Sequence, residues 1–430
     1  MRPLPLLLAC AVIAIAGCRG ATLPPSASEP VRIGVVLPQS GGLAADGQAW
    51  VRGVMLAIDE INAAGGVLGG RRVEPLVVDS ATESSAGVTG AQSVIGMGAV
   101  AVIGDGGSGN TLAIYQMVTQ MAGVPQISGS ATSTSLTMAT SSMPASERYF
   151  FRTAPPDGYQ AQVVDHIATT IITPACQNLA VLYQNDAYGM PLAQGIMTHF
   201  AGHGTIAVMQ SFTPSQASYA TEVMAVIAAM PDCVALIAYP QDAGVILRDW
   251  VTSHGMTMLP NVHWIGTDGL DSQDFITQAA MSPLLDGFVG SSPLTTPMTP
   301  EFDALAARYQ AAYGRDPENF VANYYDATAL VLLAIERAGS TNGSDVRDAL
   351  RAIGGGSGTT LAHAASLREA LAAMEGTTTL LDYVGASGPI TFDANGDTVA
   401  PYEIWQITGS SAPMLSQLAV VQAGDLMTLP

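Results

Sequence analysis

One continuous stretch, residues 99–137, constrains the fold most, because it contains a strand, a glycine-rich loop, a helix, a second strand and a polar loop in turn. The run Val100–Ile103 is short, apolar and rich in β-branched residues, which is typical of a strand buried on both faces of a parallel sheet. A helical period of apolar residues begins at Leu112. In doubly wound sheets, ligands bind at the carboxyl ends of the strands, where both loops lie. The stretch therefore predicts an α/β fold with a ligand site at this edge.

The first loop contains the spacing G-x-G-x-x-G, formed by Gly104, Gly106 and Gly109. A dinucleotide site would need an acidic residue at the end of the next strand, but that strand ends at Ser128. Asp105 would also face a pyrophosphate with like charge. We therefore interpret the glycines as a close approach for a small ligand at a helix start, and we expect no cofactor.

Composition and charge exclude several classes of function. The chain has 430 residues, enough for two domains, and a net charge of −20. An acidic chain without a basic patch is not expected to bind nucleic acid. All 15 basic residues are arginines, which excludes lysine-based catalysis. No nucleophile elbow, metalloprotease motif or carboxylate pair stands in a supporting context, so we predict no enzyme and no catalytic residue.

The N-terminus predicts export. Arg2 precedes an apolar run, Leu4–Ala16, that is too short for a permanent membrane span. Residues 15–18, Ile-Ala-Gly-Cys, resemble the lipobox of bacterial lipoproteins, which predicts a signal peptide at 1–17 and a lipidated tether at 18–30 that starts with Cys18. We therefore expect a lipid anchor in the membrane of the bacterial envelope and a domain that faces the periplasm or exterior. The alternative is an ordinary cleavable signal with an incidental cysteine.

The remaining cysteines predict one disulfide. Cys10 lies in the signal and Cys18 is assigned to lipid, which leaves Cys176 and Cys233. Cys176 comes just before the first strand of the second half and Cys233 begins its third strand. These two strands are neighbours in a flavodoxin-like order, so the cysteines should meet at one sheet edge.

We predict no metal site. His199 and His203 lie at a predicted helix end with no third ligand adjacent. Residues 393–397 resemble the start of an EF-hand calcium loop. That loop needs glycine at position six and glutamate at position twelve, but here Gly396 is at position four and Ile404 is at position twelve. We interpret this segment as a hairpin turn.

From Val31 the chain alternates strands and helices until residues 152–160, where the pattern breaks and a crossing between domains is expected. The alternation restarts at residue 178, which predicts a second doubly wound lobe. A second crossing is expected at 287–293, and the last strands are GPITFD and YEIWQIT.

Eight segments in fixed order carry a family resemblance: IGVVLPQSGGLAADGQ with INAAGGVLGGRR after its helix, VAVIGDGGSG, GVPQISGSAT, YFFRTAPPD, AVLYQNDAYG, LIAYPQDAG, WIGTDG and GPITFDANGD. The chain resembles type I periplasmic solute-binding proteins of the leucine/isoleucine/valine-binding family, which serve ABC importers. The resemblance implies two doubly wound parallel-sheet lobes, joined by a hinge of three crossovers, with the ligand between them. It places the first lobe at 31–153 and 291–399 and the second at 154–290 and 400–430.

The resemblance also implies ligand contacts in the first lobe. Ser108 matches the serine that binds the ligand carboxylate. The loop of Ser130, Ala131 and Thr132 matches the one that adds backbone and hydroxyl donors. This agrees with an anion site at a helix start.

In the second lobe the resemblance implies aromatic contacts from Tyr188 and Tyr239. Asp268 stands where the family often has a glutamate on the ligand's amino group. Asp46 departs from the family, because some members have a tryptophan there, and predicts a more polar side-chain pocket. An amino acid or related zwitterion fits this set.

Each of these residues has a structural alternative. Ser108 is also suited to cap a helix, Tyr188 and Tyr239 to pack in a core, and Asp268 to stabilise a turn. Two functions stay open: delivery of a small ligand to an ABC permease, or a sensor subunit for an amino acid, small organic acid or amide.

Overall fold

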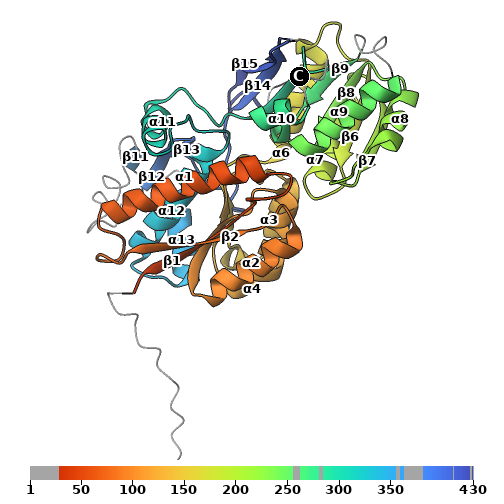
Figure 1. Ribbon diagram of the computed structural model, residues 1–430. Coiled ribbons are helices and arrows are strands. Elements are labelled where there is room, and N and C mark those ends of the chain that lie inside the picture. Colours follow the sequence, from red (N-terminus) through yellow and green to blue (C-terminus); the bar gives the residue numbers. More distant parts are fainter. Residues whose placement is uncertain are drawn as a thin grey trace, which may run out of the picture.

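The computed structural model describes residues 29–254, 262–279, 284–354, 359–362, 381–409, 411–426 and 429. The predicted signal peptide and Cys18 lie outside the described residues. Figure 1 shows two lobes, each with a sheet covered by helices on both faces. The α/β fold with two lobes is as expected. No helix in the described ranges has both the length and the apolar character needed to cross a membrane.

The first lobe is built on a parallel sheet of five described strands in the order β2-β1-β3-β4-β5. The strands are β1 (Val31–Leu37), β2 (Val73–Asp79), β3 (Ala99–Gly104), β4 (Gln126–Ser128) and β5 (Phe150–Arg152). The helices between them are α1 (Ala44–Ala63), α2 (Ser84–Gly96), α3 (Ser108–Ile114) with its continuation η1 (Tyr115–Thr119) and α4 (Gln120–Ala122), α5 (Thr134–Ser141) and η2 (Ala145–Glu147).

Later segments of the chain complete this lobe. They are α11 (Pro300–Tyr313), α12 (Val321–Ala338), α13 (Gly343–Ile353) and a small sheet of β11 (Thr359–Ala362), β12 (Leu381–Gly385) and β13 (Gly388–Ile390). Helix α12 is buried along most of its length and packs against α1. Its Asp326 accepts hydrogen bonds from Tyr383, Ala386 and Ser387, so it bonds within its own lobe.

The second lobe has a larger sheet in the order β15-β14-β10-β9-β8-β6-β7. Its strands are β6 (Asn178–Gln184), β7 (Thr205–Phe212), β8 (Cys233–Ile237), β9 (His263–Gly266), β10 (Val289–Pro293), β14 (Tyr402–Thr408) and β15 (Met414–Val421). Its helices are α6 (Asp157–His166) with η3 (Ile167–Ile171), α7 (Gly189–Phe200), α8 (Ala220–Ala228), α9 (Pro240–His254), η5 (Asp268–Leu270) and α10 (Gln273–Gln278).

The sheet of the second lobe differs from the sequence prediction at one edge. It is mixed rather than purely parallel, because β14 pairs antiparallel with both β10 and β15. The boundary placed at residue 291 falls inside β10, which stays in this sheet through Pro293. The chain therefore crosses between lobes after Arg152, after Pro293 and before Tyr402. The other domain boundaries remain a prediction.

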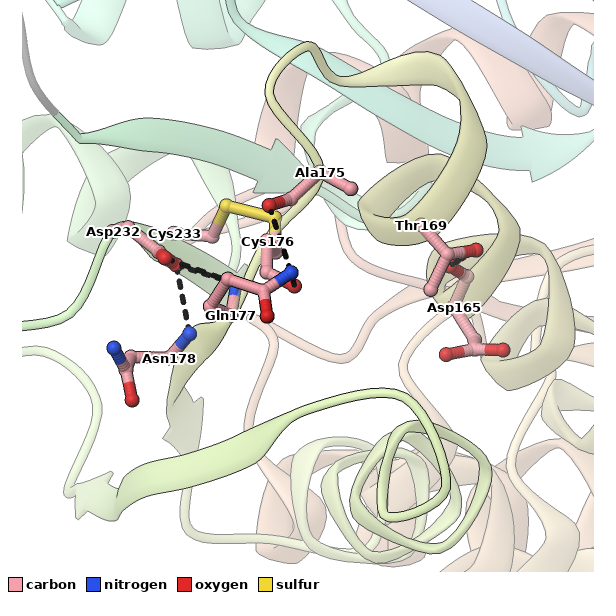
Figure 2. Close-up of a disulfide and its surroundings, with 8 residues drawn as sticks. All are labelled: Asp165, Thr169, Ala175, Cys176, Gln177, Asn178, Asp232 and Cys233. Carbon is pink, nitrogen blue, oxygen red and sulfur yellow. Dashed lines mark hydrogen bonds between the residues drawn. A yellow bond between two sulfur atoms is a disulfide. The ribbon is translucent and has the colours of Figure 1, made fainter.

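The structure contains the Cys176–Cys233 disulfide, as the strand order predicted (Figure 2). β6 and β8 are paired neighbours, and the two Cα atoms are 5.8 Å apart. Beside the bridge, the carboxylate of Asp232 accepts hydrogen bonds from the backbone N–H groups of Gln177 and Asn178, each at 2.9 Å (Figure 2). This edge holds the amino ends of the strands, opposite the edge where a ligand is expected.

Candidate ligand-binding site

A cavity lies between the two lobes, at the carboxyl ends of the strands. Seven of the eight predicted ligand-binding residues line it: Asp46, Ser108, Ser130, Thr132, Tyr188, Tyr239 and Asp268. The others that line it are Leu43, Trp50, Gly106, Gly269, Asp271, Ser272, Asn319 and Phe320. Ala131 does not line it. The lining residues come from seven separated segments, so the cavity exists only in the folded chain.

The wall from the first lobe offers uncharged polar groups. Ser108 is the first residue of α3 and is 2% exposed. The N-cap position of α3 is Gly107, so Ser108 does not occupy the capping position. Its Oγ accepts from the N–H of Ser133 at 3.3 Å, which leaves the hydroxyl hydrogen to donate elsewhere. Ser130 Oγ lies 2.9 Å from the hydroxyl of Tyr324.

A buried arginine fixes the loop that carries Thr132. Arg152 is fully buried and donates to the carbonyl oxygens of Ala131 at 3.1 Å and Ser133 at 2.9 Å. It also pairs with Asp397 at 2.7 Å. The N–H of Ala131 donates to Ser128 Oγ at 3.0 Å, so neither backbone group of Ala131 is directed at a ligand. The predicted ligand contact from Ala131 is not supported, because its backbone holds the loop instead.

Asp397 lies in the segment that we interpreted as a hairpin turn. Asp393 Oδ1 accepts from the N–H groups of Asn395 at 2.7 Å and Asp397 at 3.0 Å, so a turn is present. It does not join two paired strands, because β13 and β14 belong to different sheets. The hairpin interpretation is therefore wrong. The turn instead places the carboxylate of Asp397 beside the guanidinium of Arg152.

The wall from the second lobe combines two stacked rings with an acid. The rings of Tyr188 and Tyr239 stack with centroids 5.4 Å apart and an interplanar angle of 2°. The hydroxyl of Tyr188 donates to Asp268 Oδ1 at 2.7 Å and lies 2.8 Å from Thr267 Oγ1. Asp268 lies two residues after the end of β9, with Thr267 between the strand and Asp268. Tyr188 therefore orients the carboxylate that faces the cavity.

Eight residues that line the cavity were not among the predicted ligand contacts, and four of them have large or polar side chains that matter for a ligand: Trp50, Asp271, Asn319 and Phe320. Trp50 lies one turn after Asp46 on α1, and its ring stacks on Tyr324 with centroids 5.2 Å apart. The i, i+4 spacing from Asp46 was a usable signal for Trp50. Asp271, Asn319 and Phe320 also line the cavity, and Asn319 donates from its amide to the backbone oxygen of Asp271 across the two lobes.

The cavity is acidic. Burial, and then the nearby carboxylates of Asp274, Glu318 and Asp271, raise the pKa of Asp46 to about 7. Burial raises the pKa of Asp271 to about 6, and the charge of Asp268 acts in the same direction. Burial also raises the pKa of Asp268 itself. Among the described residues that line the cavity there is no arginine, lysine or histidine.

Two further buried acids, Glu403 and Asp157, lie near the acids of this cavity. Burial, with the charge of Asp271, raises the pKa of Glu403 to about 7. Asp157 at the start of α6 is 1% exposed, and its backbone N–H donates to the carbonyl oxygen of Thr132 at 2.8 Å. Burial, and then the charge of Asp268, raises its pKa well above the usual value. The region thus binds protons more readily when folded than when unfolded.

We expect the ligand-free protein to lose stability as the pH rises from about 4 to about 7. The folded pKa values of Asp46, Asp271 and Glu403, about 7, 6 and 7, exceed those of the unfolded chain, so folding takes up protons in this range. Each group weakens folding by about 1.4 kcal/mol per pH unit between its two pKa values. Scanning calorimetry should give a higher melting temperature at about pH 5 than at about pH 8.

Substituting these three acids with their amides, as Asp46→Asn, Asp271→Asn and Glu403→Gln together, should flatten that dependence. A melting temperature that rises with pH across this range would contradict the assignment.

Comparisons with known proteins agree with this architecture. Residues 30–411 match the profile described as "Periplasmic binding protein". The Leu/Ile/Val-binding protein BraC3 of Rhizobium johnstonii is 28% identical over 322 residues, which cover 75% of this chain and 83% of that protein. The chemotactic signal transduction system substrate-binding protein BasB of Halobacterium salinarum is 27% identical over 396 residues, 89% of this chain and 88% of that protein.

A solved structure has the same fold. The leucine binding protein LivK from Thermotoga maritima has a TM-score of 0.75 and 21% identity, with 92% of this chain and 99% of that chain covered. The profile match extends over most of the sequence and over both lobes. This chain therefore belongs to the periplasmic binding protein family.

Proposed function

We propose that this protein captures a small amino acid or a related zwitterion in the cavity between its lobes and delivers it to an ABC permease. The observation that carries the proposal is the distribution of polar groups. Ser108 and Thr132 of the first lobe offer uncharged donors near a helix start, which suits a carboxylate. Asp268 of the second lobe offers a carboxylate, which suits an ammonium group. The relative from Rhizobium, a Leu/Ile/Val-binding protein by name, supports the same ligand class.

The proposed ligand contacts, and the proposal that the ligand is an amino acid, both rest on this match between the charges of a zwitterion and the polar groups of the two walls. We assign no catalytic residue to the cavity, and no step of capture requires one. A thermal-shift screen of the mature protein against amino acids, amides and aromatic acids tests the proposal, because a ligand that binds the folded state raises the melting temperature. A zwitterion should give the largest shift. The proposal fails if simple carboxylic acids stabilise the protein and no amino acid does.

Sensing is the second candidate, and one relative favours it. The Halobacterium protein carries a chemotactic signal transduction name. Uptake of labelled ligand by cells with and without the gene separates the two functions, since an importer component is required for uptake and a sensor subunit is not. Loss of directed movement with unchanged uptake would favour sensing.

We also propose that Cys18 carries a lipid that anchors the protein to the cell envelope. The support is the run Ile15–Cys18 after an apolar segment. Replacing Cys18 with serine should release or misprocess the protein, because serine lacks the thiol that accepts the lipid. Fractionation of cells that express each form measures this. If Cys18→Ser remains in the membrane fraction with as much lipid as the original, the anchor is wrong.

A further inference from the structure

We propose that the preferred ligand of this cavity is a basic α-amino acid, whose side chain ends in a second positively charged group. The inference rests on the proposed function, because it assumes that Ser108, Thr132 and Asp268 take up the α-carboxylate and the α-amino group. It assigns a ligand to Asp46 and Asp271, two acids in the cavity that those contacts leave unused.

Asp46 and Asp271 lie where a ligand side chain would extend. Asp46 comes from the first turn of α1 in the first lobe, and Asp271 follows η5 in the second lobe. An outer hollow adjoins the cavity. Asp46 and Asp271 line both spaces, and so do Ser272 and Asn319. These shared residues mark the junction of the two spaces. A long side chain that extends outward from the α-carbon would pass between two carboxylates.

The protein supplies little compensating charge at this junction. The outer hollow adds the carboxylates of Asp274 and Glu318 and the guanidinium groups of Arg52 and Arg315. Both arginines bond to Glu318, at 2.9 and 3.2 Å. In the described part of the chain, no salt bridge involves Asp46, Asp271 or Asp274. Asp271 is 8% exposed and its carboxylate accepts a hydrogen bond from the Ser292 hydroxyl, whereas Asp46 is partly buried. Neither has a countercharge from the protein, and a cationic ligand would supply one.

The position of Asp46 in the first turn of a helix does not explain its raised pKa. An acid in the first turn of a helix is usually stabilised by the helix dipole. Here burial and the neighbouring acids dominate, and they raise the pKa of Asp46 rather than lower it. Trp50, one turn further along α1, and Phe320 also line the cavity, with ring centroids 6.4 Å apart. Aromatic faces attract ammonium and guanidinium groups, so these rings suit the same cation.

Calorimetric titration of the ligand-stripped mature protein with arginine and with citrulline tests the inference. The two ligands share shape and α-groups, but citrulline has a neutral ureido group in place of the guanidinium. Arginine should bind at least about tenfold more tightly, because a hydrogen bond to a buried charge exceeds a neutral one by this order. Lysine against norleucine makes the same comparison for an ammonium group.

Asp46→Asn should reduce the preference for arginine to less than about threefold and leave citrulline affinity nearly unchanged, since the amide keeps the shape and loses the charge. Asp271→Asn is an independent second variant. Asp303→Asn, which removes an exposed charge on α11, is the control and should keep the full preference. Arginine preference that survives both Asp46→Asn and Asp271→Asn overturns the inference.

Equal or tighter binding of citrulline or leucine overturns this inference alone and leaves the proposed function intact. Absence of binding by every amino acid overturns both. Circular dichroism of each variant confirms that a change in affinity does not come from unfolding.

Discussion

Replacing Arg152 with methionine is expected to destabilise the folded protein by about 3–5 kcal/mol, as breaking a buried ion pair usually does. The guanidinium is fully buried and donates to Asp397, to the carbonyl oxygens of Ala131 and Ser133, and to Thr137 Oγ1. Methionine fills a similar volume but donates no hydrogen bond. The variant would therefore leave a buried carboxylate and two buried carbonyl groups without their main donor. Urea unfolding monitored by circular dichroism measures the loss.

Arg32→Met is the matched control. Arg32 pairs with Glu74 at 3.0 Å, but both side chains are more than 40% exposed, 43% and 46%. Exposed pairs contribute about 0–1 kcal/mol, so this variant should be close to the original. If Arg152→Met does not fold, Arg152→Lys keeps the charge but cannot make the same set of bonds, and it should also be destabilised. Equal effects at Arg32 and Arg152 would show that the buried network does not stabilise the folded protein more than an exposed pair does.

Replacing Asp268 with asparagine is expected to weaken amino-acid binding by about 10–100-fold, because a hydrogen bond to a charged group contributes about 1.5–3 kcal/mol. The substitution keeps the side-chain shape and still accepts a bond from Tyr188, so the second-lobe wall should remain. It removes the charge that faces the ligand's ammonium group. Titration calorimetry with the tightest amino acid from the screen measures the change.

A ligand without the amino group provides the internal comparison. Its affinity should change little, so it gains relative to the amino acid in the Asp268→Asn protein. Asp303→Asn on the exposed face of α11 should leave both affinities unchanged. Unchanged amino-acid affinity in Asp268→Asn would remove Asp268 from the ligand contacts.

Local sequence pattern predicted the scaffold and the edge of the sheet where the cavity lies, and the family resemblance supplied the individual site residues. Ser108 and Thr132 follow β3 and β4, which are adjacent in a parallel sheet, so their convergence follows from strand order. Asp268 follows β9 in the same way in the other lobe. The disulfide also followed from strand order, since neighbouring strands bring their amino ends together. These features depend on periodicities that a short stretch of sequence contains.

Other features depend on packing between distant segments, and the sequence did not predict them. Asn319 and Phe320 reach the cavity because α12 docks on α1, more than 250 residues earlier in the chain. Nothing near Arg152 in the sequence indicates its role, because its ion-pair partner Asp397 lies in a turn 245 residues later. Ala131 was assigned to the ligand by position, but hydrogen bonds to Ser128 and Arg152 turn its backbone away.

The antiparallel edge of the second sheet has a similar cause. β14 enters this sheet only after the chain returns from the first lobe, and its direction is set by that crossing rather than by a local strand–helix unit. The alternation that predicted parallel strands contains no information about such a return.

A crystal structure of the complex with the tightest-binding ligand from the screen tests the central claim most directly. The account predicts one ligand in the cavity between the lobes, with carboxylate oxygens within about 3 Å of Ser108 and Thr132 and an ammonium nitrogen within about 3 Å of Asp268. A ligand bound outside this cavity, or one bound inside it with its carboxylate against Asp268, would contradict the account.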